Sequence, residues 1–208
     1  PVSAIAGAAE LLEEEVPPEQ KARFLANIKT ESRRIQTLVD RMLALSSLEH
    51  RSGLEKAEDV DINKIIEAAV QASGREAEEK ALQITITRRS ESPVTGDAFL
   101  LEQAVSNLLR NAVEFSPQGG DITLDLESDS DRISLRISDR GPGIPDYAKE
   151  KIFDRFFSLR RPGHGKKSTG LGLNFVREIA HLHKGSIDVR NLPAGGAVAM
   201  LTLPVRTS

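Results

Sequence analysis

The chain has 208 residues, of which 39% are hydrophobic and 28% charged, a balance typical of a folded globular protein and not of a disordered one. Its formal net charge of −3 gives no indication of binding to nucleic acid or to a membrane surface. The absence of cysteine excludes disulfide bonds and thiolate metal sites. No apolar run approaches the roughly 20 residues needed to span a bilayer, so if the parent protein has a membrane anchor, we expect it upstream of Pro1.

The first fifty residues predict a helical hairpin. Residues 2–15 form the first helix, whose expected apolar face consists of Val2, Ile5, Ala9 and Leu12. Pro17 and Pro18 end this helix and begin a second one. The second helix has an a/d heptad pattern at Phe24, Ile28, Glu31, Ile35, Leu38, Met42 and Leu45. Two such helices cannot bury their apolar faces alone, so we expect half of a dimeric four-helix bundle; the alternative is a core helix folded back onto the same chain.

The pattern changes after Gly53, which predicts two domains at residues 1–52 and 53–208. In the second domain we expect a strand at 60–62, a helix at 64–80 capped by Asn63, a strand at 82–87, a helix at 98–115, a hairpin of strands 122–126 and 133–138, helices at 149–156 and 171–183, and strands at 186–189 and 197–204. Helices gathered on one face of a mixed sheet give an α+β fold, here an α/β sandwich.

Two asparagines on one predicted helix indicate a metal site. Asn107 and Asn111 are four residues apart, so both carboxamides project from the same face. Uncharged oxygen ligands suit Mg²⁺, which keeps positions for water and substrate phosphates. Leu108, Ala112 and Phe115 are expected to face the sheet. Such a pair is also common on a solvated helix face, so the spacing alone leaves both alternatives open.

A glycine-containing loop follows the strand predicted at residues 133–138. Its sequence is Asp139-Arg140-Gly141-Pro142-Gly143-Ile144. A carboxylate at a strand end can accept a hydrogen bond from an exocyclic amine such as that of adenine, and the glycines let the backbone approach a flat ring. The alternative is an ordinary Asp-x-Gly turn in which the proline fixes φ.

Aromatic residues are concentrated in one short segment, although the chain is only 4% aromatic. The segment is Ile152-Phe153-Asp154-Arg155-Phe156-Phe157. The aromatic side chains predict a helix anchored to the core. Arg155 differs from them, because a guanidinium beside a nucleotide pocket matches the geometry of phosphate oxygens.

A basic, glycine-rich segment precedes the helix predicted at residues 171–183. It runs from Gly163 to Leu173, and residues 155–177 contain no Asp or Glu. Glycines before a helix N-terminus leave backbone N–H groups and the positive end of the helix dipole available to anions. We interpret the segment as a lid over a polyphosphate, with a solvated loop as the alternative.

Three common nucleotide-binding signatures are absent from the sequence. There is no strand–GxxxxGK[ST]–helix P-loop, no GxGxxG within a βαβ unit, and no protein Ser/Thr kinase signature set. The four segments described above therefore have to be interpreted together.

Their order and spacing resemble the N, G1, F and G2 boxes of the ATP-binding domain of sensor histidine kinases, which has the GHKL or Bergerat fold. The corresponding residues are 107–116, 139–144, 152–157 and 168–173. Residues 1–5 look like the tail of the phosphoacceptor box of the same kinases, so the resemblance covers nearly the whole chain. Residues 144–148 and 167–173 are further similar to the CreC-type sensor kinases.

The resemblance implies an ATP:protein-histidine phosphotransferase that uses ATP with Mg²⁺. Asp139 would bind adenine, Asn107 and Asn111 would hold Mg²⁺, and Asn107, Arg155 and Lys167 would act in catalysis. The other nucleotide-binding residues would be Gly141, Gly143, Ile144, Ser168, Thr169, Gly170, Leu171 and Gly172. The expected partners are a second copy through the hairpin and the receiver domain of a response regulator, with no nucleic acid. The chain would be the cytoplasmic domain of an inner-membrane sensor, attached to the membrane only through an upstream region.

Three features depart from the family pattern. Glu114 stands where many members have a basic residue that contacts phosphate, and Ser168 replaces the first glycine of the last box. The acceptor histidine and the acidic residue after it are expected upstream, the histidine five residues before Pro1. None of the four histidines in the chain is a credible acceptor: His50, His164, His181 and His183.

Two other functions remain possible at this level. One is another member of the same superfamily, such as an anti-sigma serine kinase or a conformational ATPase, although the heptad hairpin argues against both. The other is a degenerate kinase that only binds nucleotide, which the carboxylate of Glu114 motivates.

Overall fold

The computed structural model describes residues 1–13, 16–51, 53–161, 164–167 and 169–205, and it consists of two compact units. The first unit is Pro1–Ser47 and the second is Leu48–Ser208. Within the described residues, no helix combines the length and the hydrophobicity required to cross a bilayer.

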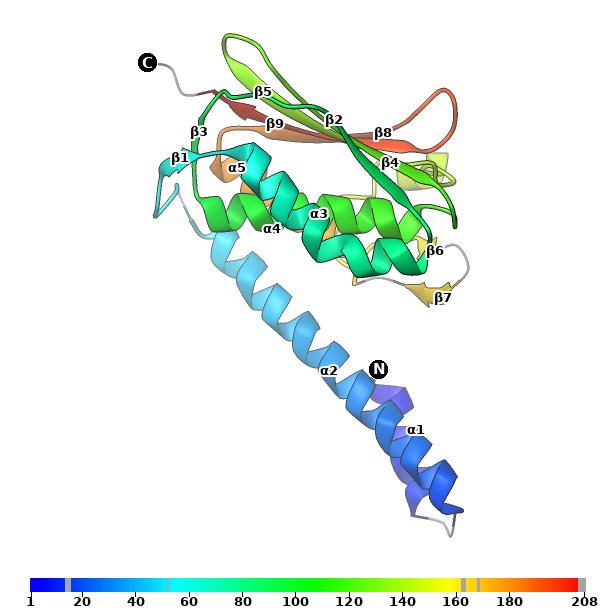
Figure 1. Ribbon diagram of the computed structural model, residues 1–208. Coiled ribbons are helices and arrows are strands. Elements are labelled where there is room, and N and C mark those ends of the chain that lie inside the picture. The colour runs from blue at the N-terminus through cyan, green and yellow to red at the C-terminus, as the bar shows by residue number, and fades with distance from the viewer. Residues whose placement is uncertain (14–15, 52, 162–163, 168, 206–208) are drawn as a thin grey trace. The chain divides into compact units, whose positions relative to one another are not determined.

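The first unit contains helix α1 (Val2–Leu12) and most of the long helix α2 (Pro18–Glu49), as Figure 1 shows. In α2 the heptad positions from Phe24 to Leu38 are partly buried. Hydrophobic residues between or beyond them remain open to solvent, with Leu25 51% and Leu43 65% exposed. The hairpin by itself therefore leaves apolar surface uncovered.

The apolar face of α1 differs from the expected one. Ala8 is buried and Ile5 and Leu12 are partly buried, whereas Val2 and Ala9 are exposed. The prediction was therefore wrong for Val2 and Ala9, because the many alanines of this helix make more than one face apolar and the spacing did not select between them.

The second unit combines a mixed sheet with helices on one face, which confirms the predicted α+β sandwich (Figure 1). Its elements are β1 (Glu58–Val60), α3 (Ile62–Glu79), β2 (Gln83–Arg88), β3 (Val94–Gly96), α4 (Ala98–Phe115), β4 (Asp121–Ser128), β5 (Arg132–Ser138), the 3-10 helix η1 (Asp146–Ala148), β6 (Arg160–Arg161), β7 (His164–Lys167), α5 (Gly172–Leu182), β8 (Ser186–Asn191) and β9 (Ala197–Pro204). The five-stranded sheet has the order β2-β4-β5-β9-β8, with β2 and β4 parallel and the other pairs antiparallel.

The core of this unit lies between the sheet and helices α3, α4 and α5. Strands β4 and β5 alternate strictly, so that Ile122, Leu124, Leu126, Ile133, Leu135 and Ile137 are buried against the helices. Each of the first two helices begins at an aspartate cap. The Asp61 side chain accepts a hydrogen bond from Asn63 N at 2.9 Å, and Asp97 accepts one from Leu100 N at 3.1 Å. Asp61 and not Asn63 is therefore the cap of α3.

The prediction of a helix at residues 149–156 is wrong. After η1 the chain forms successive tight turns, in which Lys151 N donates to Ala148 O and Asp154 N donates to Lys151 O. Phe156 has a positive φ of 65°, which no helix residue adopts, and its N–H donates to Gly170 O at 2.9 Å. Contact with a distant segment thus overrides the helical spacing of the aromatics.

A buried histidine joins the end of α5 to the start of α4. His183 is 3% exposed, its Nδ1 lies 2.7 Å from Ile179 O, and its Nε2 accepts a hydrogen bond from Asp97 N at 3.0 Å. Both contacts fit the neutral ring with its proton on Nδ1. Burial lowers the pKa of His183 below its usual value, although the Ile179 carbonyl and the Asp97 charge oppose the shift.

Acidification should therefore destabilise the second unit through His183. The neutral ring is favoured only in the folded state, so this contribution is present above the unfolded pKa of about 6.5 and is lost as the pH falls toward the lower folded pKa. Urea unfolding between pH 8 and 5 should show a steeper loss of stability in the wild type than in His183→Gln. Equal slopes in the two proteins would contradict this role.

Candidate functional site

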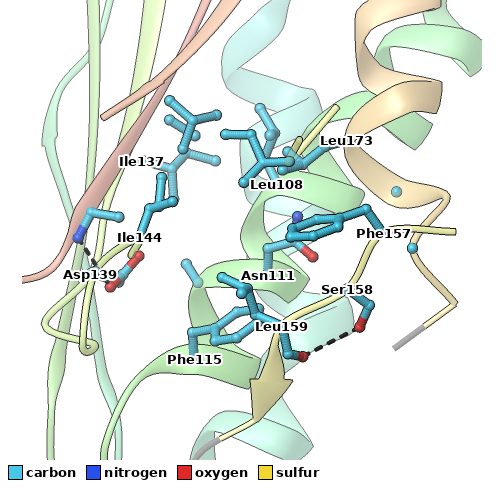
Figure 2. A pocket seen from close by; sticks show the side chains of 18 residues that line it. Leu108, Asn111, Phe115, Ile137, Asp139, Ile144, Phe157, Ser158, Leu159 and Leu173 are labelled. Atoms are coloured by element: carbon cyan, nitrogen blue, oxygen red, sulfur yellow. Dashed lines mark hydrogen bonds between the residues drawn. The ribbon is translucent and has the colours of Figure 1, made fainter. Parts of the chain in front are cut away.

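A pocket of about 890 Å³, including the solvent at its mouth, opens in the second unit. Its walls come from α4, the sheet, the loop after β5 and the start of α5 (Figure 2). The lining residues are Leu108, Asn111, Ala112, Phe115, Ile137, Asp139, Gly143, Ile144, Ile152, Phe157, Ser158, Leu159, Gly170, Gly172, Leu173, Val189, Ala197 and Ala199. Mostly apolar walls with a few polar groups are typical of a small-molecule site.

Asp139 is the acidic group of this pocket and directly follows β5. Its Oδ1 accepts hydrogen bonds from Gly141 N at 2.7 Å and from Ala197 N at 3.3 Å. Figure 2 shows the carboxylate on the sheet side of the pocket, across from Asn111 on α4. Burial raises the pKa of the Asp139 carboxyl, and the two backbone hydrogen bonds oppose the rise. One carboxylate oxygen is fixed, so the group can accept a hydrogen bond from a ligand in a defined direction.

The loop after Asp139 needs its glycines for close packing. A Cβ on Gly141 would lie 2.7 Å from the Phe115 carbonyl oxygen and 2.8 Å from Asp139 Oδ1. Gly143 has a φ of +74°, a conformation that favours glycine. Ile144 follows it and is 9% exposed with its side chain in the pocket wall. The loop thereby brings backbone and an apolar side chain to the same wall as the carboxylate.

The two asparagine oxygens converge near the start of α5. A Cβ on Gly172 would lie 3.5 Å from Asn107 Oδ1 and 3.9 Å from Asn111 Oδ1. Asn107 is 8% exposed, its Nδ2 donates to Gln103 O at 2.8 Å, and Arg110 donates to its Oδ1. Two carboxamide oxygens beside a helix N-terminus form a donor set that fits Mg²⁺ together with phosphate oxygens.

The aromatic segment packs against the glycines before α5. The Phe153 and Phe157 side chains belong to a small apolar cluster with Ile144 and Ile152, whereas Phe156 is 57% exposed. A Cβ on Gly170, whose φ is +68°, would overlap the Phe156 backbone. The two segments therefore fix each other's position, although Phe156 and Gly170 are 14 positions apart in the sequence.

Arg155 lies outside the pocket lining. Its exposed guanidinium pairs with Glu49, at the end of α2 in the same unit. To meet a phosphate, Arg155 would have to release this carboxylate.

The remaining residues of the sequence prediction lie at the margins of the pocket or beyond the described chain. Leu171 is buried at the N-cap of α5, and Thr169 is partly buried outside the lining. Ser168 and the side chain of Lys167 lie outside the described residues. The Glu114 peptide oxygen accepts a hydrogen bond from Lys80 Nζ at 2.9 Å, which ties α3 to the end of α4.

Several lining residues were not identified from the sequence. Leu108, Ala112 and Phe115 were expected only to face the sheet. Leu108 and Ala112 do belong to the core shared with the sheet, and all three residues also line the pocket. Val189, Ala197 and Ala199 come from the last two strands, where the alternation predicted strands but gave no sign of a site. Asn191, which lies outside the lining, was also missed. Its carboxamide makes two hydrogen bonds with Ile144, and the only available signal was an asparagine two residues before Pro193.

Two protein-family models match the chain. The model of histidine kinase-, DNA gyrase B- and HSP90-like ATPases matches residues 96–207, and that of the His Kinase A (phospho-acceptor) domain matches residues 1–51. The first of these covers all the pocket-lining residues.

Curated relatives extend the similarity along the chain. The sensor protein CreC of Escherichia coli (strain K12) is 43% identical over 203 residues, which cover 98% of this chain and 42% of the relative. The sensor-like histidine kinase SenX3 of Mycolicibacterium smegmatis is 32% identical over 206 residues, which cover 98% of this chain and 54% of the relative. The chain thus spans about half the length of the curated relatives it matches.

Solved structures share the fold. The catalytic domain of histidine kinase ThkA has a TM-score of 0.64 and 25% identity, covering 72% of this chain and 98% of that domain. ThkA in complex with response regulator protein TrrA has a TM-score of 0.77 and 23% identity, covering 99% of this chain and 57% of that one. By its sequence matches, the chain belongs to the family of histidine kinase-, DNA gyrase B- and HSP90-like ATPases, and within that family it is similar to sensor histidine kinases.

Proposed function

We propose that the second unit binds ATP with Mg²⁺ and transfers the γ-phosphate to a histidine of a sensor kinase, for relay to an aspartate of a response regulator. The observation that carries the proposal is a pocket with the fixed carboxylate of Asp139 and the carboxamide of Asn111 in its lining. The oxygen of Asn107, which is outside the lining, converges with that of Asn111 beside the N-terminus of α5. The first group suits a nucleobase and the second suits a metal-bound polyphosphate.

The base would bind between the apolar walls near Asp139. Oδ1 of this residue is occupied by backbone N–H groups, which leaves Oδ2 to accept a hydrogen bond from the exocyclic amine of adenine. Leu108, Ile144 and Leu173 provide the apolar surface on which a flat ring can pack. Gly141 and Gly143 let the backbone approach the ring.

The phosphates would lie at the start of α5, where Gly170 and Gly172 line the pocket. Thr169 and Leu171 belong to the same backbone segment, and we assign Ser168 to this segment from its position in the sequence. Asn107 and Asn111 would hold Mg²⁺, which neutralises phosphate charge when bound. Arg110 would have to release Asn107 Oδ1 for this to occur. Arg155 and Lys167 are the proposed cations at the transferred phosphate, where charge has to be stabilised during transfer.

The hairpin at residues 1–52 would supply the dimer interface, and residues 53–208 the catalytic domain. Uncovered apolar residues of α2 and the match to the phospho-acceptor domain model support dimerisation. The structure of ThkA with a response regulator supports a receiver domain as partner. We further propose that the chain is the cytoplasmic domain of a membrane-anchored sensor, as the relation to sensor proteins suggests.

The dimer interface can be tested at Ile35, a partly buried heptad position. Ile35→Lys should convert dimers to monomers, because removing an ammonium group from water in an apolar seam is unfavourable. Light scattering gives the molar mass directly, and Gln36→Lys, at an exposed neighbouring position, serves as the control. A wild-type chain that is monomeric at all accessible concentrations would rule out this interface.

The second candidate function is nucleotide binding without transfer, which Glu114 motivates. In the test, the chain is mixed with a separate hairpin that carries its acceptor histidine, and Mg²⁺ and radiolabelled ATP are added. Acid-labile label on the hairpin supports the histidine kinase. Bound ATP without label would favour the binding module, and acid-stable label on the chain would favour a serine kinase.

A further inference from the structure

We infer that Asn191 is a positioning residue of the nucleotide site, whose carboxamide fixes the loop from Asp139 to Ile144 in the shape that recognises the base. The inference rests on the proposed binding of ATP in the pocket. It concerns a residue at the end of β8, and Asn191 itself is not part of the pocket lining.

The carboxamide pairs with both backbone groups of one loop residue. Asn191 Oδ1 accepts a hydrogen bond from Ile144 N at 2.6 Å, and Asn191 Nδ2 donates one to Ile144 O at 2.9 Å. In an antiparallel sheet, the backbone N–H and C=O of one residue make the same pair of hydrogen bonds with the residue opposite on the neighbouring strand. The side chain thus replaces a strand and joins the loop to the edge of the sheet, where β8 is the last strand.

The same contact accounts for the conformation of the preceding glycine. A Cβ on Gly143 would lie 2.8 Å from Asn191 Oδ1, so the carboxamide occupies the space that a side chain would need. With its φ of +74°, Gly143 then directs Ile144 into the pocket wall. Loss of the carboxamide would free both residues to move away from the base.

The other end of the loop is held by the strand that follows Asn191. Asp139 N donates to Ala197 O at 2.9 Å, and Ala197 N donates to Asp139 Oδ1 at 3.3 Å. A Cβ on Gly196 would overlap the Asp139 carbonyl oxygen. The β8–β9 turn therefore supports the loop on both sides, with Asn191 on one side and Ala197 on the other. Both contacts lie at the proposed base and not at the proposed phosphates.

Asn191→Asp tests the inference with almost no change in shape. An ionised carboxylate can still accept from Ile144 N, but it cannot donate and places an oxygen against Ile144 O. At pH 8 the affinities for adenosine, ADP and ATP should each fall by about tenfold, the loss expected for one missing hydrogen bond and an unpaired acceptor. The KM for ATP in phosphotransfer should rise while kcat is unchanged.

Protonation of the introduced carboxyl restores the missing donor. The ratio of wild-type to variant adenosine affinity should therefore approach one as the pH is lowered from 8 to about 5. Charged groups adjacent in the loop and strand, Asp139, Arg140 and Arg190, are present in both proteins, so the ratio at each pH removes their contribution. A purely structural loss of stability would not recover in this direction.

Asp188→Asn, at an exposed position of the same strand, should bind adenosine like the wild type. Asn191→Ser removes both bonds without adding a charge, because its hydroxyl is shorter than the carboxamide, and should also lose about tenfold, which gives a second result if Asn191→Asp does not fold. Wild-type affinity at pH 8 in folded variants would overturn the inference and leave the proposed function intact. A wild type that binds neither adenosine nor ATP would instead overturn the proposed function.

Discussion

Asp139→Asn is expected to weaken ATP binding by about tenfold to a hundredfold while the protein stays folded. The loss corresponds to a charge-assisted hydrogen bond of roughly 1.5–3 kcal/mol between the carboxylate and the amine of adenine. The fold should tolerate the change, because asparagine retains an oxygen that can accept from Gly141 N and Ala197 N. Calorimetry with ATP and adenosine should show similar factors for the two ligands.

The same variant should also narrow the preference for ATP over GTP. Guanine has an oxygen where adenine has its amine, so the wild-type carboxylate repels it, while an asparagine amide can donate to it. Asp121→Asn, at an exposed position at the start of β4, is the control and should bind both nucleotides like the wild type. Unchanged ATP affinity in folded Asp139→Asn would remove base recognition from this residue.

Acidification should weaken ATP binding to the wild type through Asp139. The carboxylate has to be ionised to accept the hydrogen bond, and burial raises its pKa, so the loss begins above the pH at which an ordinary aspartate titrates. Asp139→Asn should lack this component, and the ratio of the two affinities over pH measures it directly.

Asn111→Ala is expected to remove most of the part of the ATP affinity that depends on Mg²⁺. The apparent affinity for Mg²⁺ itself should fall by about tenfold to a hundredfold or more. Asn111 Oδ1 lies near Gly172, where we propose that the phosphates bind, so adenosine binding should be unaffected. Titrations of ATP with Mg²⁺ and with EDTA separate the two contributions. Glu102→Ala, exposed on the same helix, should retain the wild-type difference.

An equal loss of adenosine and Mg·ATP affinity in Asn111→Ala would contradict this assignment. It would mean that the residue shapes the pocket and does not hold the metal. Asn107 is less suitable for this test, because it is buried and bonded to Gln103 and Arg110, so its replacement also disturbs α4.

Regular elements could be predicted because their periodicity is local. Helix α4 and strand β9 have the predicted bounds, and Leu82, Ile84 and Ile86 lie on one face as expected. The aromatic segment could not be predicted in this way. Its backbone is fixed by contact with Gly170, which only the folded chain brings beside Phe156.

Residues of the site could likewise be recognised in the sequence only where they belong to one short segment. Asp139, Asn111 and the glycines belong to short segments with their own spacing, so they could be found in the sequence. Asn191 and Ile144 are 47 residues apart and meet only through the sheet. Arg155 belongs to a recognisable segment, but its pairing with Glu49 involves residues 106 positions apart and could not be inferred.

The central claim is that this nucleotide site phosphorylates a histidine within a shared helical bundle. The most direct measurement mixes the polypeptide of residues 1–208 with a longer, histidine-containing copy whose own site carries Asp139→Asn and Asn111→Ala. After incubation with radiolabelled ATP and Mg²⁺, we predict acid-labile label on the longer copy alone, because transfer requires the reacting atoms to be held about 3–3.5 Å apart. Absence of that label, despite demonstrated mixed dimers and bound ATP, or acid-stable label on the 1–208 polypeptide, would contradict the claim.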